Sequence, residues 1–518
     1  MRYFSTPSIL TFGACLALPA TAQDGTGESL KEKPNIVLIY ADDMGYGDLS
    51  CYGAERVQTP NTDALATNGL RFRNAHSAAA TSTPSRYGLF TGEYPWRRKG
   101  TQIAAGDAAL IIKPGRYTVA KMLKEAGYTT AAVGKWHLGI GNTDGEQDWN
   151  GKLSPGPREI GFDYSYIMAA TGDRVPCVYL ENQQVVNLDP ADPISVSYTK
   201  NFPGEPTGKD NPELLTRLKP SLNHGHDQSI VNGISRIGYM KGGQAALWDD
   251  ESIADSITVH AVRFIERNKE KPFFLYFGTN DIHVPRFPHE RFRDKTGMGH
   301  RGDAIVQFDW SVGEIVRTLK EAGIFENTLI IITSDNGPVV DDGYMDDAVE
   351  KLMDHKPWGP FRGGKYSTFE AGTRVPFVVH WPGKIRTGVS DALVSQIDLM
   401  ATMASLTGSE KKEEIPVDSR DQLSAWLGVD PDGRDYVIGA ASTLTVLTRD
   451  WKYIEPGNGR PYNKLTGTEL GNRPVDQLYD MRSDRGEYDN LANKNKLMLR
   501  RMKQILEEEK SRGTELDL

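Results

Sequence analysis

The sequence predicts an α/β fold, in which a large, mixed but mostly parallel sheet is sandwiched by helices and a smaller α+β subdomain follows. Continuous apolar runs of strand length, the first at residues 35–40, are typical of strands that are buried on both faces. Amphipathic helical stripes alternate with these runs along the chain, as they do in α/β folds with helices on both faces of the sheet. The 518 residues suffice for a core domain of several hundred residues and a smaller companion.

The first 22 residues have the pattern of a secretory signal peptide. Arg2 supplies the positive start, residues 9–18 are apolar, and Ala20 to Ala22 form a small-x-small cleavage motif. The apolar run has about half of the ~20 residues that a membrane-spanning helix needs, and no later run approaches that length. We therefore expect a secreted protein without a membrane span that begins at Gln23. A buried terminal helix is the alternative interpretation.

Residues 23–408 alternate apolar strands with helices and are expected to form the catalytic domain. Thr118 can cap a helix that Gly127 ends, just before the next apolar run. A second helical stripe ends at Gly323 and again leads into an apolar run. Beyond residues 35–40, such runs lie at 128–133, 273–277, 329–333 and 375–381.

Two segments depart from this alternation. Residues 164–243 are rich in Pro, Gly and Asn and poor in periodicity, so we expect a loop-rich insertion over one face of the sheet. A polar hinge after Gly408 opens the smaller subdomain, residues 409–518. There the sequence predicts short strands near 436–438, 444–448 and 452–454, and an amphipathic helix near 496–510.

The acidic balance of the chain restricts its partners. The formal net charge of −9 argues against a nucleic-acid ligand, which would need a basic face. The same charge offers an anionic substrate no long-range attraction, so an anion site must be built from local cations. Beyond the signal peptide, Cys51 and Cys177 have no zinc-binding spacing and form no disulfide framework.

Polar side chains follow four of the apolar runs. Ligands of open α/β sheets bind beyond the carboxyl ends of the strands, so these side chains are expected at one edge. Three carboxylates and one amide carbonyl among them are hard oxygen ligands, which suit calcium or magnesium better than zinc. Calcium tolerates irregular geometry better than magnesium. The side chains that follow the runs are Asp42 and Asp43, Asp335 and Asn336, Lys135 and His137, and His283.

The segment Ser82-Thr83-Pro84-Ser85-Arg86 points to anion chemistry. Pro84 suits the first helical position, which would place Ser82 at a helix N-terminus, where backbone N–H groups and the helix dipole favour an anion. These five residues resemble the C/S-x-P-S-R signature of type I sulfatases of the alkaline-phosphatase superfamily, in its serine form. The chain also resembles other motifs of that family, which span nearly the whole mature chain. They lie at residues 41–48, 134–139, 334–337, 363–365 and 477–480.

This resemblance implies an alkaline-phosphatase-like fold and a sulfuric ester hydrolase. A sulfatase-maturating enzyme would oxidise Ser82 to formylglycine, whose hydrate attacks sulfur with one hydroxyl and expels sulfate through the other. Arg86 would hold that hydrate, His137 would act as the base in the expulsion, and His283 would protonate the leaving oxygen. Lys135 and Lys365 would bind the sulfate oxygens. One Ca²⁺ ion would be bound by Asp42, Asp43, Asp335 and Asn336.

The expected substrate is a sulfated carbohydrate. The signal peptide and the serine signature resemble those of periplasmic bacterial enzymes that degrade glycans. The insertion resembles those of enzymes acting on galactose or N-acetylgalactosamine sulfates of host or algal glycans, with Arg174, His224 and His226 as candidate sugar contacts. Two alternatives stay open. One is a phosphomonoester or phosphodiester hydrolase with unmodified Ser82 as its nucleophile, and the other is a non-catalytic binder of sulfated glycans.

Overall fold

The computed structural model describes residues 33–409 and 411–513. The predicted signal peptide, residues 1–22, lies outside these residues. In the described part of the chain, no helix combines the length and the apolar composition that crossing a membrane requires.

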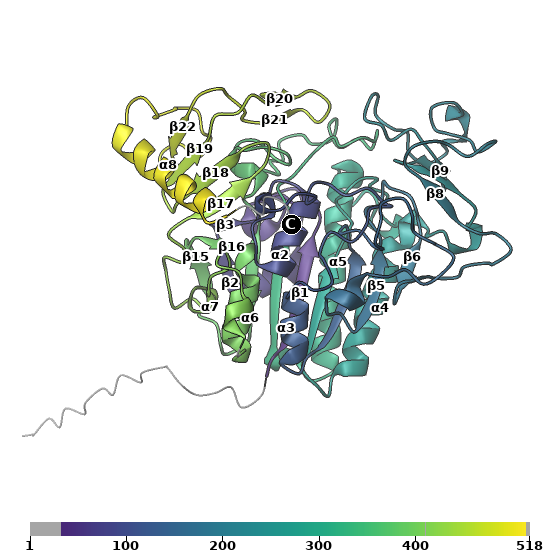
Figure 1. Ribbon diagram of the computed structural model, residues 1–518, viewed down its shortest axis with the longest axis horizontal. Coiled ribbons are helices and arrows are strands. Elements are labelled where there is room, and N and C mark those ends of the chain that lie inside the picture. The colour runs from purple at the N-terminus through teal and green to yellow at the C-terminus, as the bar shows by residue number, and fades with distance from the viewer. Residues whose placement is uncertain (1–32, 410, 514–518) are drawn as a thin grey trace, which may run out of the picture. The chain divides into compact units, whose positions relative to one another are not determined.

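Within the described residues, ten strands form one mixed sheet (Figure 1). Each of the apolar runs that the sequence showed contributes a strand to it, and β1 and β13 are buried along their whole length. The predicted α/β fold with a mixed, mostly parallel sheet is confirmed. The parallel centre of the sheet has the order β13 (Thr328–Ser334), β1 (Asn35–Ala41), β12 (Phe273–Gly278), β4 (Thr129–Lys135) and β5 (Tyr164–Met168).

Short strands extend the sheet at both edges, and here the structure differs from the predicted insertion at 164–243. The beginning of that segment supplies β5, β6 and β7 of the sheet, and the loop-rich part starts after Val185. These strands have five residues or fewer and no amphipathic helix before them, so the periodicity did not reveal them. The edge strands are β14 (Phe377–His380), β2 (Leu70–Phe72) and β15 (Gly388–Ser390) on one side, and β6 (Tyr179–Glu181) and β7 (Gln184–Val185) on the other.

Small strand pairs lie outside the main sheet. In the rest of the predicted insertion, two antiparallel pairs brace the loops. They are β8 (Ser195–Ser197) with β11 (Tyr239–Lys241), and β9 (Ile230–Val231) with β10 (Ile234–Ser235). Elsewhere β3 (Ala75–His76) pairs with β16 (Val394–Ser395).

Helices cover both faces of the main sheet (Figure 1). On one face α4 (Ile253–Asn268) packs against β4 and β12, and α5 (Gly299–Glu321) packs between α4 and α1 (Pro60–Thr67). Thr118 caps α3 as the sequence predicted, because its side chain accepts a hydrogen bond from the backbone of Lys121. The other face carries α2 (Ser82–Thr91), α3 (Val119–Glu125), α6 (Leu399–Thr407) and the short α7 (Leu423–Trp426).

A four-stranded antiparallel sheet follows near the C-terminal end. Its strands are β17 (Val437–Ala440), β18 (Leu444–Leu447), β19 (Trp451–Ile454) and β22 (Gln477–Asp480). The first three lie close to the predicted ranges, whereas β22 was not predicted as a strand because it is short and flanked by polar residues. The apolar side of α8 (Lys496–Ser511) packs in a core shared with this sheet. Between β19 and β22, the hairpin β20 (Tyr462–Asn463) and β21 (Thr468–Glu469) extends from the sheet (Figure 1).

Candidate active site

The carboxyl ends of the central strands bring the predicted polar residues to one buried site. Because β13, β1, β12 and β4 are adjacent and parallel, the residues that follow them meet at one edge of the sheet. Lys135 is the last residue of β4 itself rather than a residue beyond it. The buried residues gathered there are Asp42, Asp43, Lys135, His137, His283, Asp335 and Asn336, together with Ser82, Arg86 and Lys365.

Ser82 is held between a cation and an anion. It is the first residue of α2, so Pro84 is the third helical residue and not the first as the sequence suggested. The Ser82 Oγ donates a hydrogen bond to Asp335 Oδ2 at 2.5 Å and accepts one from Arg86 Nε at 2.9 Å. Arg86 lies one helical turn further along α2 and also donates to Asp335 at 2.7 Å. These contacts fix the position of the Ser82 oxygen.

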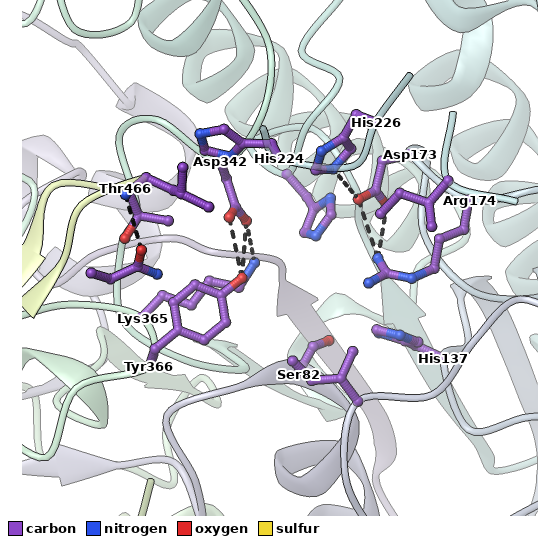
Figure 2. A pocket seen from close by; sticks show the side chains of 15 residues that line it. Ser82, His137, Asp173, Arg174, His224, His226, Asp342, Lys365, Tyr366 and Thr466 are labelled. Carbon is purple, nitrogen blue, oxygen red and sulfur yellow. Dashed lines mark hydrogen bonds and ion pairs between the residues drawn. The ribbon is translucent and has the colours of Figure 1, made fainter. Parts of the chain in front are cut away.

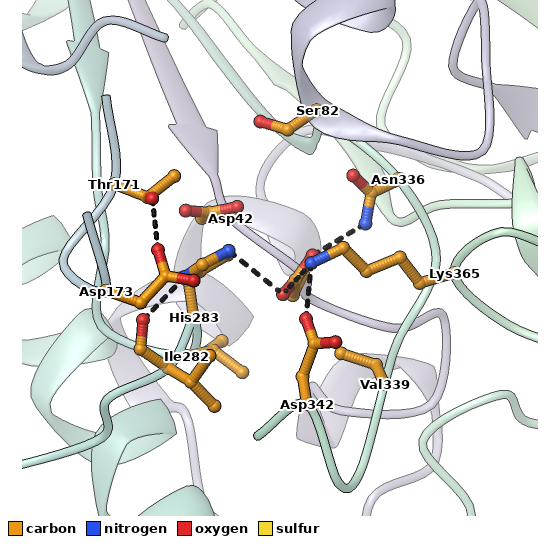
Figure 3. Close-up of polar contacts among 12 residues, drawn as sticks. Asp42, Ser82, Thr171, Asp173, Ile282, His283, Asn336, Val339, Asp342 and Lys365 are labelled. Carbon is orange, nitrogen blue, oxygen red and sulfur yellow. Dashed lines mark hydrogen bonds and ion pairs between the residues drawn. The ribbon is translucent and has the colours of Figure 1, made fainter. Parts of the chain in front are cut away.

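Two lysines contact the acidic side chains of the site, and Figure 3 shows one of them, Lys365, beside Asp342. Lys135 Nζ donates to Asp42 and lies 3.7 Å from Asp335 Oδ2. Lys365 Nζ donates to Asp43 Oδ2 and to Asp342 Oδ2, both at 2.8 Å. Burial by itself would lower the pKa of Lys365, but the two carboxylates raise this pKa well above its ordinary value. Lys365 is therefore a cation in the folded protein.

Two side-chain oxygen atoms of the site lack a hydrogen bond within the described part of the chain. Among the described residues, Asp42 Oδ1 and Asn336 Oδ1 are buried and accept no hydrogen bond. The orientation of the Asn336 amide follows from its Nδ2, which donates to Asp43 Oδ1 at 2.8 Å. Burial raises the pKa of Asp42 well above its ordinary value, so its charge is costly without a further cation.

These residues fit a bound divalent cation. Unpaired buried oxygens are expensive, and a hard cation such as Ca²⁺ or Mg²⁺ would satisfy them. Asp42, Asp43 and His283 each offer a possible ligand atom, and these atoms lie within 4.8 Å of one another. The unpaired Asn336 oxygen extends this group toward β13.

The two histidines of the site are neutral and have defined tautomers. His137 Nε2 donates to the carbonyl of Ala104 at 3.0 Å, which leaves Nδ1 without a partner among the described residues. His283 Nδ1 donates to the carbonyl of Val284 at 2.7 Å, so its Nε2 is an acceptor and lies 3.9 Å from Asp43 Oδ2. Burial lowers the pKa of both histidines well below the ordinary value, with nearby lysines adding to the effect. Each ring is therefore neutral and offers one nitrogen as a hydrogen-bond acceptor.

A pocket of about 230 Å³ opens next to Ser82 (Figure 2). It is lined by His137, His283 and Lys365, and also by the predicted sugar contacts Arg174, His224 and His226. Arg174 and His226 both bind Asp173, each at 3.0 Å. The carboxylates of Asp42, Asp43 and Asp335 are not among the residues that line the pocket. The pocket therefore joins the predicted site residues to the predicted sugar contacts.

Sequence reasoning missed several residues that line this pocket. Asp173 has a signal in the sequence, since it precedes the candidate Arg174. Asp342 and Tyr366 lie in irregular segments that showed no pattern. The hairpin of β20 and β21 lies far from Ser82 in the sequence and comes to the pocket only when the chain is folded. The missed lining residues are Ile103, Asp173, Ile237, Asp342, Tyr366, Asn463, Leu465 and Thr466.

Known proteins resemble this chain along most of its length. The family model named Sulfatase matches residues 34–409. The chain is 51% identical over 483 residues to an N-acetylgalactosamine-6-O-sulfatase of Bacteroides thetaiotaomicron, which covers 93% of this chain and 94% of the relative. It is 30% identical over 486 residues to arylsulfatase A of Homo sapiens, covering 90% and 84% of the two chains. A solved structure concerned with the metabolism of multiple glycosaminoglycans by B. thetaiotaomicron aligns with a TM-score of 0.90 at 51% identity, over 93% of this chain and 100% of the solved one.

Proposed function

Because this chain belongs to the sulfatase family and is thus a sulfuric ester hydrolase, we propose that it removes the 6-O-sulfate of N-acetylgalactosamine units in a sulfated glycan. The observation that carries the choice of sugar is the 51% identity to an N-acetylgalactosamine-6-O-sulfatase across 93% of the chain. The pocket beside Ser82 supports a carbohydrate substrate, since it combines charged, imidazole and hydroxyl groups around one small cavity.

Ser82 is proposed to act after oxidation to formylglycine by a sulfatase-maturating enzyme. Formylglycine supplies, as its hydrate, one hydroxyl that attacks sulfur and a second that allows sulfate to be expelled. The surroundings of Ser82 support this chemistry, because Arg86 and Asp335 hold its oxygen by two hydrogen bonds. The guanidinium of Arg86 would also stabilise negative charge on that oxygen.

A calcium ion is proposed to be held by Asp42, Asp43, Asp335 and Asn336. When bound, it would supply Lewis-acid stabilisation of the sulfate oxygens. The unpaired oxygens of Asp42 and Asn336 support this ligand set. His283 lies close enough to have been a candidate ligand, but oxygen ligands suit calcium better than imidazole does.

The remaining site residues are proposed to bind sulfate or to transfer protons. Lys135 and Lys365 are proposed to bind the sulfate oxygens, because both are buried beside the carboxylates near Ser82 and Lys365 also lines the pocket. His137 would take a proton through its unpartnered Nδ1 while sulfate is expelled. His283 would give a proton to the leaving sugar oxygen through Nε2, after taking it up from the pocket.

The proposed setting is the bacterial periplasm. The predicted signal peptide and the Bacteroides relative support export to a compartment where glycans are degraded. The proposed partners are therefore a sulfated glycan and a maturating enzyme that acts on Ser82.

A panel of defined sulfated monosaccharides tests the proposal. Protein produced with a sulfatase-maturating enzyme is incubated with the 3-, 4- and 6-O-sulfates of galactose and N-acetylgalactosamine, and released sulfate is measured. We expect the fastest release from N-acetylgalactosamine 6-O-sulfate. The Ser82→Ala variant, produced in the same way, is the control and should release none.

Mass spectrometry of the same preparations tests the modification. The peptide that contains Ser82 should lack two hydrogens relative to unmodified serine. An active protein with an unmodified Ser82 would disprove the formylglycine mechanism and favour direct attack by the serine. Preference for another sugar or position would disprove only the choice of substrate.

A further inference from the structure

Two walls of the pocket each carry a carboxylate, although the proposed substrate is an anion. Asp173 lies on the wall beside Arg174, and Asp342 lies on the wall beside Lys365 and Tyr366 (Figure 2). A carboxylate next to an anion site opposes the binding of negative charge. Its presence therefore needs a reason other than sulfate binding.

The cations of the pocket wall are already engaged. Among the described residues that line the pocket, the lysines and arginines are Arg174 and Lys365. Arg174 is paired with Asp173 at 3.0 Å, and Lys365 is shared between Asp43 and Asp342. Lys365 is also the residue proposed to bind the sulfate that is removed. A second sulfate on the same sugar would find no uncommitted cation among these lining residues.

Asp342 is held in a fixed position on the pocket wall. Its Oδ2 accepts from Lys365 at 2.8 Å and its Oδ1 accepts from the Tyr366 hydroxyl at 3.2 Å. The pocket volume of about 230 Å³ is smaller than the ~300–1,000 Å³ typical of ligand pockets, which indicates room for a single sugar unit. A further sulfate of that unit would therefore lie close to the Asp342 carboxylate, which is mostly buried and so is only partly screened by water.

We infer that Asp342 is a specificity-determining residue that excludes sugar units carrying a second sulfate on the ring being processed. Repulsion built against a competing ligand is a common source of specificity. The inference rests on the proposed function, because it presumes that the pocket binds a sulfated sugar. It also places the enzyme in a reaction sequence, since a disulfated unit would first have to lose its other sulfate to a second sulfuric ester hydrolase.

Paired substrates test this inference. The matured enzyme is assayed by sulfate release from N-acetylgalactosamine 6-O-sulfate and from N-acetylgalactosamine 4,6-di-O-sulfate. We expect kcat/KM to favour the monosulfate by at least about tenfold in the wild type. Asp342→Asn keeps the shape of the side chain and should reduce that preference about tenfold, mainly by lowering KM for the disulfate. Asp341→Asn is the matched control, because its carboxylate binds Ser221 and Gly343 and does not line the pocket, and it should leave the preference unchanged.

A failure of this inference and a failure of the proposed function would give different results. If Asp342→Asn lowers kcat/KM for both esters by the same factor, Asp342 only positions Lys365 and the inference is wrong. If the matured wild type hydrolyses neither ester, the proposed function is wrong instead. In that case the Kd of each sugar is measured by calorimetry on the Ser82→Ala form, with and without Asp342→Asn. A tenfold change in the ratio of the two Kd values would support the charge barrier, and an unchanged ratio or no binding would disprove it.

Discussion

His137 has a fixed orientation and an unpartnered ring nitrogen, so its loss should affect chemistry more than binding. Its Nε2 is anchored to Ala104, and its Nδ1 accepts no hydrogen bond from the described residues. We expect His137→Ala to lower kcat for sulfate release by at least about 100-fold, within the range found for general acid–base residues, with little change in KM. The assay is released sulfate from matured protein, with circular dichroism to verify the fold.

A histidine outside the pocket provides the control for this substitution. His260 of α4 stacks on Tyr166 and is not among the pocket-lining residues. His260→Ala should retain near wild-type kcat. Near wild-type turnover in His137→Ala would show that the role given to His137 is incorrect.

Single residues differ in how far the sequence alone could place them. Asp42 and Asp335 could be placed together because each follows an apolar run, and parallel strands end at a common edge. Asp342 could not be placed, because it lies in an irregular segment where an aspartate is an ordinary surface residue. Its position follows from Lys365 and Tyr366, which reach it from a separate loop. The residues that directly follow buried strands were thus predictable from the pattern, whereas Asp342 was not.

At the scale of elements, β4 and β12 approach each other closely where they enter the site. Gly134 of β4 has a φ of +95°, and a Cβ built on it would lie 1.9 Å from the backbone oxygen of Gly278 in β12. Any larger residue would separate the strands just before Lys135. We expect Gly134→Ala to lower the free energy of unfolding by about 2 kcal/mol or more, from backbone strain and the steric clash together. Chemical denaturation measures this change.

Gly53 provides a control that separates the backbone strain from the steric clash. Gly53 also has a positive φ, +104°, but a Cβ there would meet nothing within 4 Å. Gly53→Ala therefore carries the backbone strain alone and should cost less. Equal losses in the two variants would contradict a steric limit between β4 and β12.

At the scale of the whole molecule, a buried charged cluster links the C-terminal sheet to the main body. Lys452 of β19 lies 3.1 Å from Glu370 and 3.2 Å from Glu487, and all three side chains are buried. Burial raises the pKa of Glu487 to about 7, with Glu370 adding to the effect and Lys452 opposing it. Folded Glu487 therefore binds a proton more tightly than the unfolded chain does.

This difference in proton binding makes the stability of the folded protein depend on pH. Between about pH 4.5 and pH 7 the folded protein holds more protons at Glu487, so this residue makes the protein less stable as pH rises through that window. Glu487→Gln removes the effect. We expect the Tm of the variant, relative to wild type, to increase by about 2 °C or more between pH 5.5 and pH 8.5. Exposed Glu326→Gln is the control, and a difference in Tm that does not change with pH would disprove the assignment.

The hairpin formed by β20 and β21 supplies pocket residues that are structurally separate from the groups around Ser82. The hairpin contributes Asn463, Leu465 and Thr466 to the pocket, while Arg86 and Asp335, which bind Ser82, come from α2 and from the end of β13. The turn is partly exposed and sits on a short two-stranded element, so replacements there disturb little of the core. Substitutions in the hairpin should therefore change one wall of the pocket and leave the residues around Ser82 in place. If the pocket binds the sugar as proposed, we expect that exchanging this hairpin between relatives changes the glycan preference more than the rate of the chemistry.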